Sequence, residues 1–186
     1  MARWRGVRGS ASDRGAAAVE FALVVPVLFL LVFGILDYGR FFFDSVSLRQ
    51  GAREAARQAV VQQYPGSVLG SSPTPACSSS LFAVGARIAC SAKAASDITI
   101  GTPAVNIPTI PAVGTNVAGW HQGNQLLVCM ASKELGTGFV PLPGGGMGIG
   151  FLRTKVYMSI EVDKPSNGDP TFTETDPTGG TWSWCK

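Results

Sequence analysis

The longest apolar stretch of the chain lies close to its N-terminus. Between Ala16 and Leu36 the one ionisable side chain is Glu20, and no other residue there is strongly polar. At about 1.5 Å rise per residue, a helix of this length covers the roughly 30 Å hydrocarbon core of a bilayer. The pattern therefore predicts a transmembrane helix over residues 16–36, with Pro26 as a candidate kink inside it.

The helical pattern continues beyond this segment. Residues 37–63 contain no proline and include an alanine-rich run, which favours helix. Small and apolar side chains recur at helical spacing along one stripe. The stripe consists of Phe41, Val46 or Leu48, Ala52, Ala55, Ala56 and Ala59. We expect one helix over residues 16–63, ended by Tyr64-Pro65-Gly66, whose second half (37–63) lies outside the membrane and carries a head.

Residues 64–186 predict a small head of mixed helix and strand. The expected elements are a helix over 79–94 and strands over 98–100, 124–132 and 153–163, with loops over 101–124 and from Pro165 onward. In the last strand Val156, Met158, Ile160 and Val162 alternate with polar residues, which suits an antiparallel sheet packed on a helix. The predicted fold class is α+β: a long N-terminal transmembrane helix, then a head with one further helix and an antiparallel sheet.

The charge of the chain is concentrated before the apolar segment. Residues 1–15 carry four arginines and one aspartate, which equals the net charge of +3 of the whole chain. Basic flanks stay cytoplasmic, so residues 1–15 predict a cytoplasmic leader and an extracytoplasmic head. A removed secretory signal is disfavoured, because the apolar run is too long and no small-residue cleavage site follows it. The remaining chain is neutral, which offers no case for nucleic-acid binding.

Four cysteines follow the apolar segment: Cys77, Cys90, Cys129 and Cys185. An even number in an oxidising compartment predicts two disulfides. A helix over 79–94 would hold Cys77 and Cys90 about 20 Å apart, beyond disulfide reach, so each is expected to pair with Cys129 or Cys185. No Cys-x-x-Cys motif or Cys/His cluster is present, and no metal or cofactor is predicted.

The order of residues at the start of the apolar segment resembles the processing and assembly signature of type IV prepilins. A basic leader is followed by Gly15-Ala-Ala-Ala-Val-Glu-Phe21, then Pro26, Gly34-Ile-Leu-Asp-Tyr-Gly-Arg40 and Gly51-Ala-Arg-Glu-Ala-Ala-Arg57. Over about residues 14–60 the chain resembles the TadE-like family, minor pseudopilin-like proteins of tight-adherence (Tad) pili. The resemblance implies that a prepilin peptidase cuts the Gly15–Ala16 bond and that Glu20 guides assembly.

Several side chains carry two interpretations each. Glu20 is either a carboxylate that snorkels to the interface or the partner of the new α-ammonium of Ala16, on its own chain or a neighbour. The row Arg49, Arg53 and Arg57 is either a solvated face, with Glu54 in reach of Arg57, or a contact for acidic groups of a neighbouring subunit or lipid headgroups.

Aromatic residues mark two further places in the chain. Residues 41–43, three phenylalanines, suit an aromatic belt at the membrane exit. Trp182 and Trp184, beside Cys185, are expected to lock the tail onto the sheet.

No catalytic constellation is visible, since His121 is the single histidine and Gly144-Gly-Gly146 predicts a turn. We therefore expect no enzyme. The resemblance to the TadE-like family implies instead a membrane-anchored subunit needed for assembly of a Tad-type pilus. The resemblance implies as partners a prepilin peptidase, other pilin-like subunits and the inner-membrane assembly platform, besides membrane lipid. The alternative is a permanently anchored envelope protein whose head binds a ligand or partner without entering a fibre. A secreted enzyme finds no active-site support.

Overall fold

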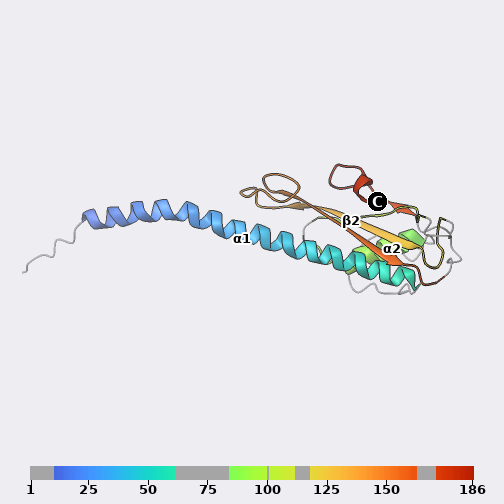
Figure 1. The fold of residues 1–186 in the computed structure, drawn as a ribbon. Helices are drawn as coiled ribbons and strands as arrows, with labels where there is room; N and C mark the ends of the chain where they lie inside the picture. The colour runs from blue at the N-terminus through green and yellow to red at the C-terminus, as the bar shows by residue number, and fades with distance from the viewer. Residues whose placement is uncertain (1–10, 62–83, 100, 112–117, 163–170) are drawn as a thin grey trace, which may run out of the picture.

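A long helix forms the axis of the molecule and carries a small head along its C-terminal half (Figure 1). The computed structural model describes residues 11–61, 84–99, 101–111, 118–162 and 171–186. Their elements are α1 (Ala11–Val60), α2 (Val84–Ala95), β1 (Ala104–Ile107), β2 (Gln125–Leu135), β3 (Ile149–Ser159), β4 (Phe172–Thr173) and the 3-10 turn η2 (Trp182–Trp184). The predicted α+β fold, with a long apolar N-terminal helix, a second helix and an antiparallel sheet, is confirmed over these residues.

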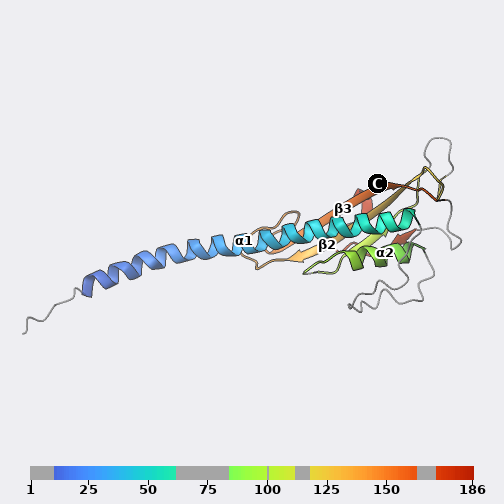
Figure 2. The ribbon, with the colours of Figure 1, turned by 90° about the horizontal axis from the view of Figure 1, so that it is seen from below.

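The sheet of the head has the strand order β3-β2-β1-β4, and every pairing is antiparallel. Strands β2 and β3 have 11 residues each and form a long hairpin, paired from Gln125 with Ser159 to Leu135 with Ile149. This hairpin runs along α1, and α2 lies beside the same helix (Figure 2). The two helices and the sheet enclose the main core.

Strand β2 is buried on both faces because the sheet is covered on both sides. Leu126, Val128 and Met130 belong to the core shared with α1 and α2. Leu127 and Cys129 point the other way and pack against the C-terminal tail. The alternation of a strand is therefore present, but neither of its faces is wet.

The second half of α1 buries the predicted stripe of small residues. Ala52, Ala55, Ala56 and Ala59 are fully buried, and of the two alternatives Leu48 is 1% exposed whereas Val46 is 54% exposed. Gly51 lies at the closest approach of the two helices, since a Cβ there would stand 2.5 Å from the carbonyl oxygen of Ala92. Small side chains on α1 thus let the backbone of α2 approach closely.

The helix boundaries differ modestly from the predicted ones. Helix α1 begins at Ala11, inside the predicted leader, and ends at Val60. The predicted stop at residues 64–66 and the predicted start of the second helix at residue 79 lie outside the described residues. The second helix is confirmed where the structure describes it, from Val84 to Ala95.

The first strand was predicted in the wrong place. Residues 98 and 99 are not in a strand, whereas β1 lies within the predicted loop 101–124. Pro103 and Pro108 flank β1 and favour a loop by local propensity, but all four residues of β1 are buried between β2 and β4. Tertiary pairing therefore overrides the local signal.

The hairpin strands and the tail also differ from expectation. Strand β2 runs three residues beyond the predicted end, and β3 is shifted toward the N-terminus relative to residues 153–163. Val162, predicted to face the core, lies beyond β3 and is 44% exposed. The tail, predicted as loop, contributes the edge strand β4 and the turn η2.

Candidate functional site

The first half of α1 projects from the head and exposes apolar side chains on all sides (Figure 1). We call residues 15–36 the stalk. Every stalk residue from 15 to 32 except Val25 is exposed. In the part of the chain that the structure describes, α1 is the one helix long and apolar enough to cross a membrane. A helix that is apolar all round needs an apolar surrounding, which supports membrane anchoring.

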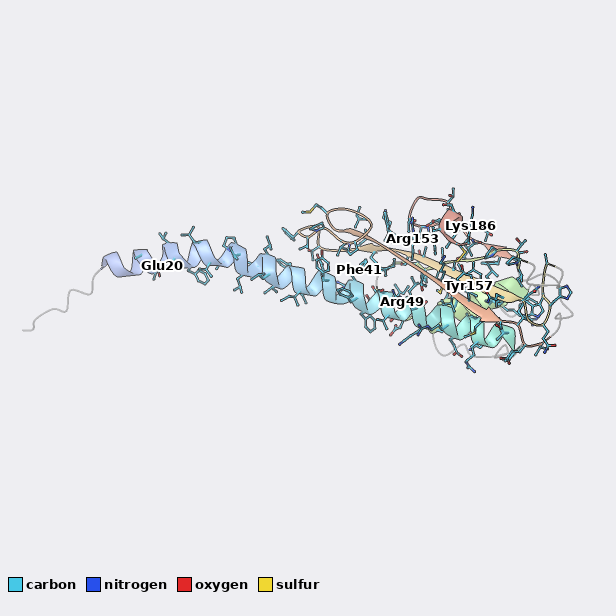
Figure 3. The ribbon with its side chains drawn as sticks, in the orientation of Figure 1. Glu20, Phe41, Arg49, Arg153, Tyr157 and Lys186 are labelled. Carbon is cyan, nitrogen blue, oxygen red and sulfur yellow. A yellow bond between two sulfur atoms is a disulfide. The ribbon has the colours of Figure 1, made fainter. Side chains whose placement is uncertain are left out.

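Glu20 lies near the free end of the stalk, far from the head (Figure 3). Gly15 and Ala16 precede it in the same helix. All three are exposed, and a Cβ at Gly15 would meet nothing within 4 Å. Ala16 and Glu20 stand at positions i and i+4 of one helix, so their side chains share a face. The α-ammonium proposed as the partner of Glu20 exists only after cleavage, so the cleavage and the pairing stay predictions. The helix continues through Pro26, and the predicted kink also stays a prediction.

Two buried carboxylates attach the head to α1 just beyond the stalk. The carboxylate of Asp37 accepts hydrogen bonds from the backbone N–H of Thr137 at 3.1 Å and from its hydroxyl at 2.7 Å. In the same way, Asp44 accepts the N–H and the hydroxyl of Thr99 at 3.0 Å. The two aspartates are two helical turns apart and face the same side. Sequence reasoning missed them, although a polar pair on the apolar stripe of a helix was a visible signal.

A third acidic side chain, Glu134 on β2, borders the same small cavity as these aspartates and is 4% exposed. The pKa of Glu134 is raised to about 7, chiefly by burial and also by the nearby Asp44, while the hydroxyl of Ser132, which donates at 2.7 Å, opposes the shift. The acids and Arg40 border a cavity of about 10 Å³, about the size of one water. The cluster thus lies where the sheet is attached to the helix.

The arginine row divides into two parts with different partners. Arg57 donates to Glu54 at 2.7 Å, as predicted, and this hydrogen bond lowers the pKa of Glu54. Arg49 and Arg53 instead face β3, where they border a groove of about 280 Å³ together with Arg153 and Lys155. Arg49 is about 20 Å beyond residue 36 along the helix, so the groove lies out of reach of lipid headgroups at that level.

The four cations that border the groove form no salt bridge with an acidic side chain among the described residues. Arg153 donates to the hydroxyl of Thr178 at 2.6 Å and lies over the ring of Trp184, while Lys155 donates to the C-terminal oxygen of Lys186. Among the described residues, the salt bridges involve Arg57 and Lys93 and neither Arg49 nor Arg53. Four cations along one groove favour an acidic partner.

The C-terminal tail is held on the sheet by a disulfide and two tryptophans. Cys129 of β2 and Cys185 are bonded, with their Cα atoms 6.0 Å apart. Trp182 and Trp184 pack beside them, and the indole N–H of Trp182 donates to the carbonyl of Glu174 at 2.7 Å. The predicted locking of the tail is confirmed.

The predicted pairing of Cys90 is wrong. Cys129 and Cys185 bond to each other, and Cys90 is itself disulfide-bonded, so its partner is neither of them. The remaining cysteine, Cys77, lies outside the described residues. The prediction that Cys77 and Cys90 are about 20 Å apart assumed a helix that begins at residue 79. The described helix begins at Val84, only about 9 Å along the axis from Cys90, so it does not exclude a bond between the two cysteines.

The three phenylalanines after the stalk do not act as one belt. Phe41 is 8% exposed and packs in the core against Gly150, while Phe42 and Phe43 are exposed. The glycines at 144–146 form a turn between β2 and β3, as predicted, with backbone bonds from Gly145 to Leu142 and from Gly146 to Ile149.

No curated protein and no solved structure shows significant similarity to the chain. Residues 15–57 match the family model described as TadE-like protein. The match covers the stalk and most of the head-bound half of α1, includes Gly15, Glu20 and Asp37, and ends before the sheet. Over residues 15–57, the chain is therefore similar to TadE-like proteins.

Proposed function

We propose that the chain is a pilin-like subunit that contributes to the assembly of a Tad-type pilus. It is inserted with residues 1–15 in the cytoplasm, cut after Gly15 by a prepilin peptidase, and stored in the membrane by residues 16–36. Its role is structural, and the chain itself carries out no catalysis. The observation that carries the proposal is that the TadE-like match coincides with a projecting, fully apolar stalk whose charged residue is Glu20.

The stalk has a surface suited to two successive apolar surroundings. In the bilayer its side chains contact lipid, and in a fibre they would contact the stalks of other pilin-like subunits. The head contacts α1 from Phe33 onward, so it leaves most of the stalk surface available for this packing. The inner-membrane assembly platform would move the subunit from one surrounding to the other.

In this proposal Glu20 fixes the axial position of one stalk relative to its neighbours. Cleavage creates an α-ammonium at Ala16, and a carboxylate from the same or an adjacent subunit would neutralise it inside the apolar stalk bundle. Such a buried pair adds specificity more than stability, because both charges lose their hydration. Removing one member leaves the other unpaired and costs about 3–5 kcal/mol per site.

The basic groove is a candidate contact with acidic groups of a sister subunit. It lies on the head, away from the stalk, so it would join heads rather than anchors. A permanently anchored protein that binds an acidic partner through this groove is the second candidate function. The two functions differ in cleavage, which only the pilin-like function requires.

The test replaces Glu20→Gln, which removes the charge and keeps the shape. A matched variant combines Val19→Glu with Glu20→Val, which keeps the composition and moves the carboxylate to another face of the helix. Both variants should reach parental membrane levels and lose residues 1–15 by intact mass, but fail to support piliation or to co-purify with pilus proteins.

Parental assembly by the Glu20→Gln variant would make the carboxylate dispensable. A parent that keeps residues 1–15 in cells with the matching peptidase would favour the permanently anchored protein instead.

A further inference from the structure

The connection between β2 and β3 is an uncharged, apolar loop. We call residues 136–148 the hairpin tip. It contains eight glycine or proline residues besides Phe139, Val140, Leu142 and Met147, and the nearest charged residues along the sequence are Glu134 and Arg153. A loop at a protein surface is ordinarily polar, so this composition calls for an apolar surrounding.

The hairpin tip lies beside α1 and points toward the stalk (Figures 1 and 2). The rings of Phe139 and Phe33 are stacked with their centroids 5.4 Å apart. Val140 approaches Gly34, and the hydroxyl of Tyr38 donates to the carbonyl of Pro141 at 2.8 Å. The tip therefore runs alongside the last turn of the predicted transmembrane segment.

This position places the tip at the depth of the bilayer surface. Phe33 lies three residues before the end of the segment 16–36, which is about 5 Å inside the apolar region. Phe139, stacked on it, lies at the same level. If α1 crosses a bilayer, the tip reaches the membrane on the side of the head.

The outer side of the tip is apolar and uncovered. Phe139 and Met147 are each 62% exposed. Both contribute apolar side chains to the surface that continues into the exposed residues of the stalk. That continuity identifies the occupant of this surface as the same lipid that surrounds the stalk.

Part of the backbone of the tip is hydrogen-bonded within the tip itself. The N–H groups of Gly136 and Gly148 donate to carbonyls at 2.8 and 3.1 Å, and that of Leu142 donates to Gly146 at 3.1 Å. Pro141 and Pro143 have no N–H to satisfy. Each of these internal hydrogen bonds lowers the cost of bringing that part of the loop into a membrane interface.

We propose that the hairpin tip inserts Phe139 and Met147 into the interfacial region of the bilayer next to α1. The head then has two membrane contacts, the transmembrane helix and the tip, and cannot rotate freely about the stalk. This inference rests on membrane insertion of α1 and does not depend on cleavage or on fibre assembly.

The experiment uses the purified full chain in phosphatidylcholine–phosphatidylglycerol vesicles with an environment-sensitive fluorescent amino acid at one position. The positions are 139 and 147 in the tip, 33 in the stalk as the membrane control, and 162 as the exposed control at the far end of β3. Quenching is measured with lipids brominated near the headgroup and, separately, with aqueous iodide.

Probes at 139 and 147 should be quenched by the brominated lipid about as strongly as the probe at 33, emit at shorter wavelength than the probe at 162, and resist iodide. A probe at 139 that behaves like the probe at 162 overturns the proposal. Protection from both quenchers would assign the tip to a contact between copies of the chain, which also overturns it. Absence of lipid quenching at 33 would remove the membrane insertion on which the proposal depends.

Discussion

The two halves of α1 form one continuous helix but are suited to different surroundings. From residue 15 to 32 apolar side chains point in every direction and nearly all are exposed, whereas from residue 37 to 60 small apolar side chains lie on one buried stripe with charged residues opposite. The first half therefore has no side that favours water, and the second half has one side for the sheet and one for solvent. The difference shows that the distribution of side chains around a helix, rather than their number, determines what covers it.

The change between the halves occurs over the two turns that begin at Asp37. Here the carboxylates of Asp37 and Asp44 replace apolar contacts with hydrogen bonds to the head. Phe41 between them is buried, while its neighbours Phe42 and Phe43 are exposed. The junction thus combines a polar attachment on one side with an aromatic surface on the other, as suits a segment at a membrane surface.

The largest expected effect tests the close packing of the second half. Gly51→Leu should destabilise the head by about 3 kcal/mol or more, because the first added atom meets the backbone of α2. Gly39→Leu is the matched control on the same helix, since a Cβ at Gly39 meets nothing within 4 Å. That control should be neutral or stabilising by up to about 1 kcal/mol through helix propensity.

Denaturant unfolding of the full chain in detergent, followed by the fluorescence of the buried Trp120, measures both glycine variants. Equal stability of the two would mean that α1 and α2 are not in close contact.

The next largest expected effect is a dependence of the stability of the head on pH. The pKa of Glu134 is raised by burial from 4.5 to about 7, so the folded head holds a proton that the unfolded chain releases. Its contribution is fully present below pH 4.5 and is lost as the pH rises through 7. The free energy of unfolding should fall over this window by up to about 3 kcal/mol.

Glu134→Gln is the matched variant, because the amide keeps the shape and carries no charge. It should remove this part of the pH dependence and be more stable than the parent at pH 8, where the carboxylate beside Asp44 is ionised. Circular dichroism during denaturant titration at several pH values is the measurement. If the free energy of unfolding of the variant depends on pH as steeply as that of the parent, Glu134 is ionised in the folded head throughout this range.

A smaller and more local effect concerns the junction. Asp37→Ala should cost about 1–3 kcal/mol, because it leaves the N–H of Thr137 without its buried acceptor. Hydrogen exchange should show lost protection of the Thr137 amide while the amides of β1 stay protected. Asp97→Ala, at an exposed aspartate, is the control and should change stability by less than about 0.5 kcal/mol. Retained protection at Thr137 would show that the tip is held by other contacts.

The sequence by itself determined the helix and its two environments. A run of apolar residues with one carboxylate predicts the stalk, and the spacing of Phe41, Ala52 and Ala56 predicts the buried stripe, because both depend on residues a few positions apart along one helix. The signature from Gly15 to Glu20 is equally local, which is why the family match could be anticipated from the residues alone.

What only the tertiary structure decided are the contacts between distant segments. Strand β1 exists because β2 and β4 flank it, although its own prolines favour a loop, and Cys129 bonds with Cys185 because the tail folds back over β2. Phe139 lies beside Phe33, more than a hundred positions earlier, because the register of the β2–β3 hairpin sets how far the tip extends along α1. Hydrophobic pattern encodes which residues avoid water, and the assembled sheet and helix decide which of them meet.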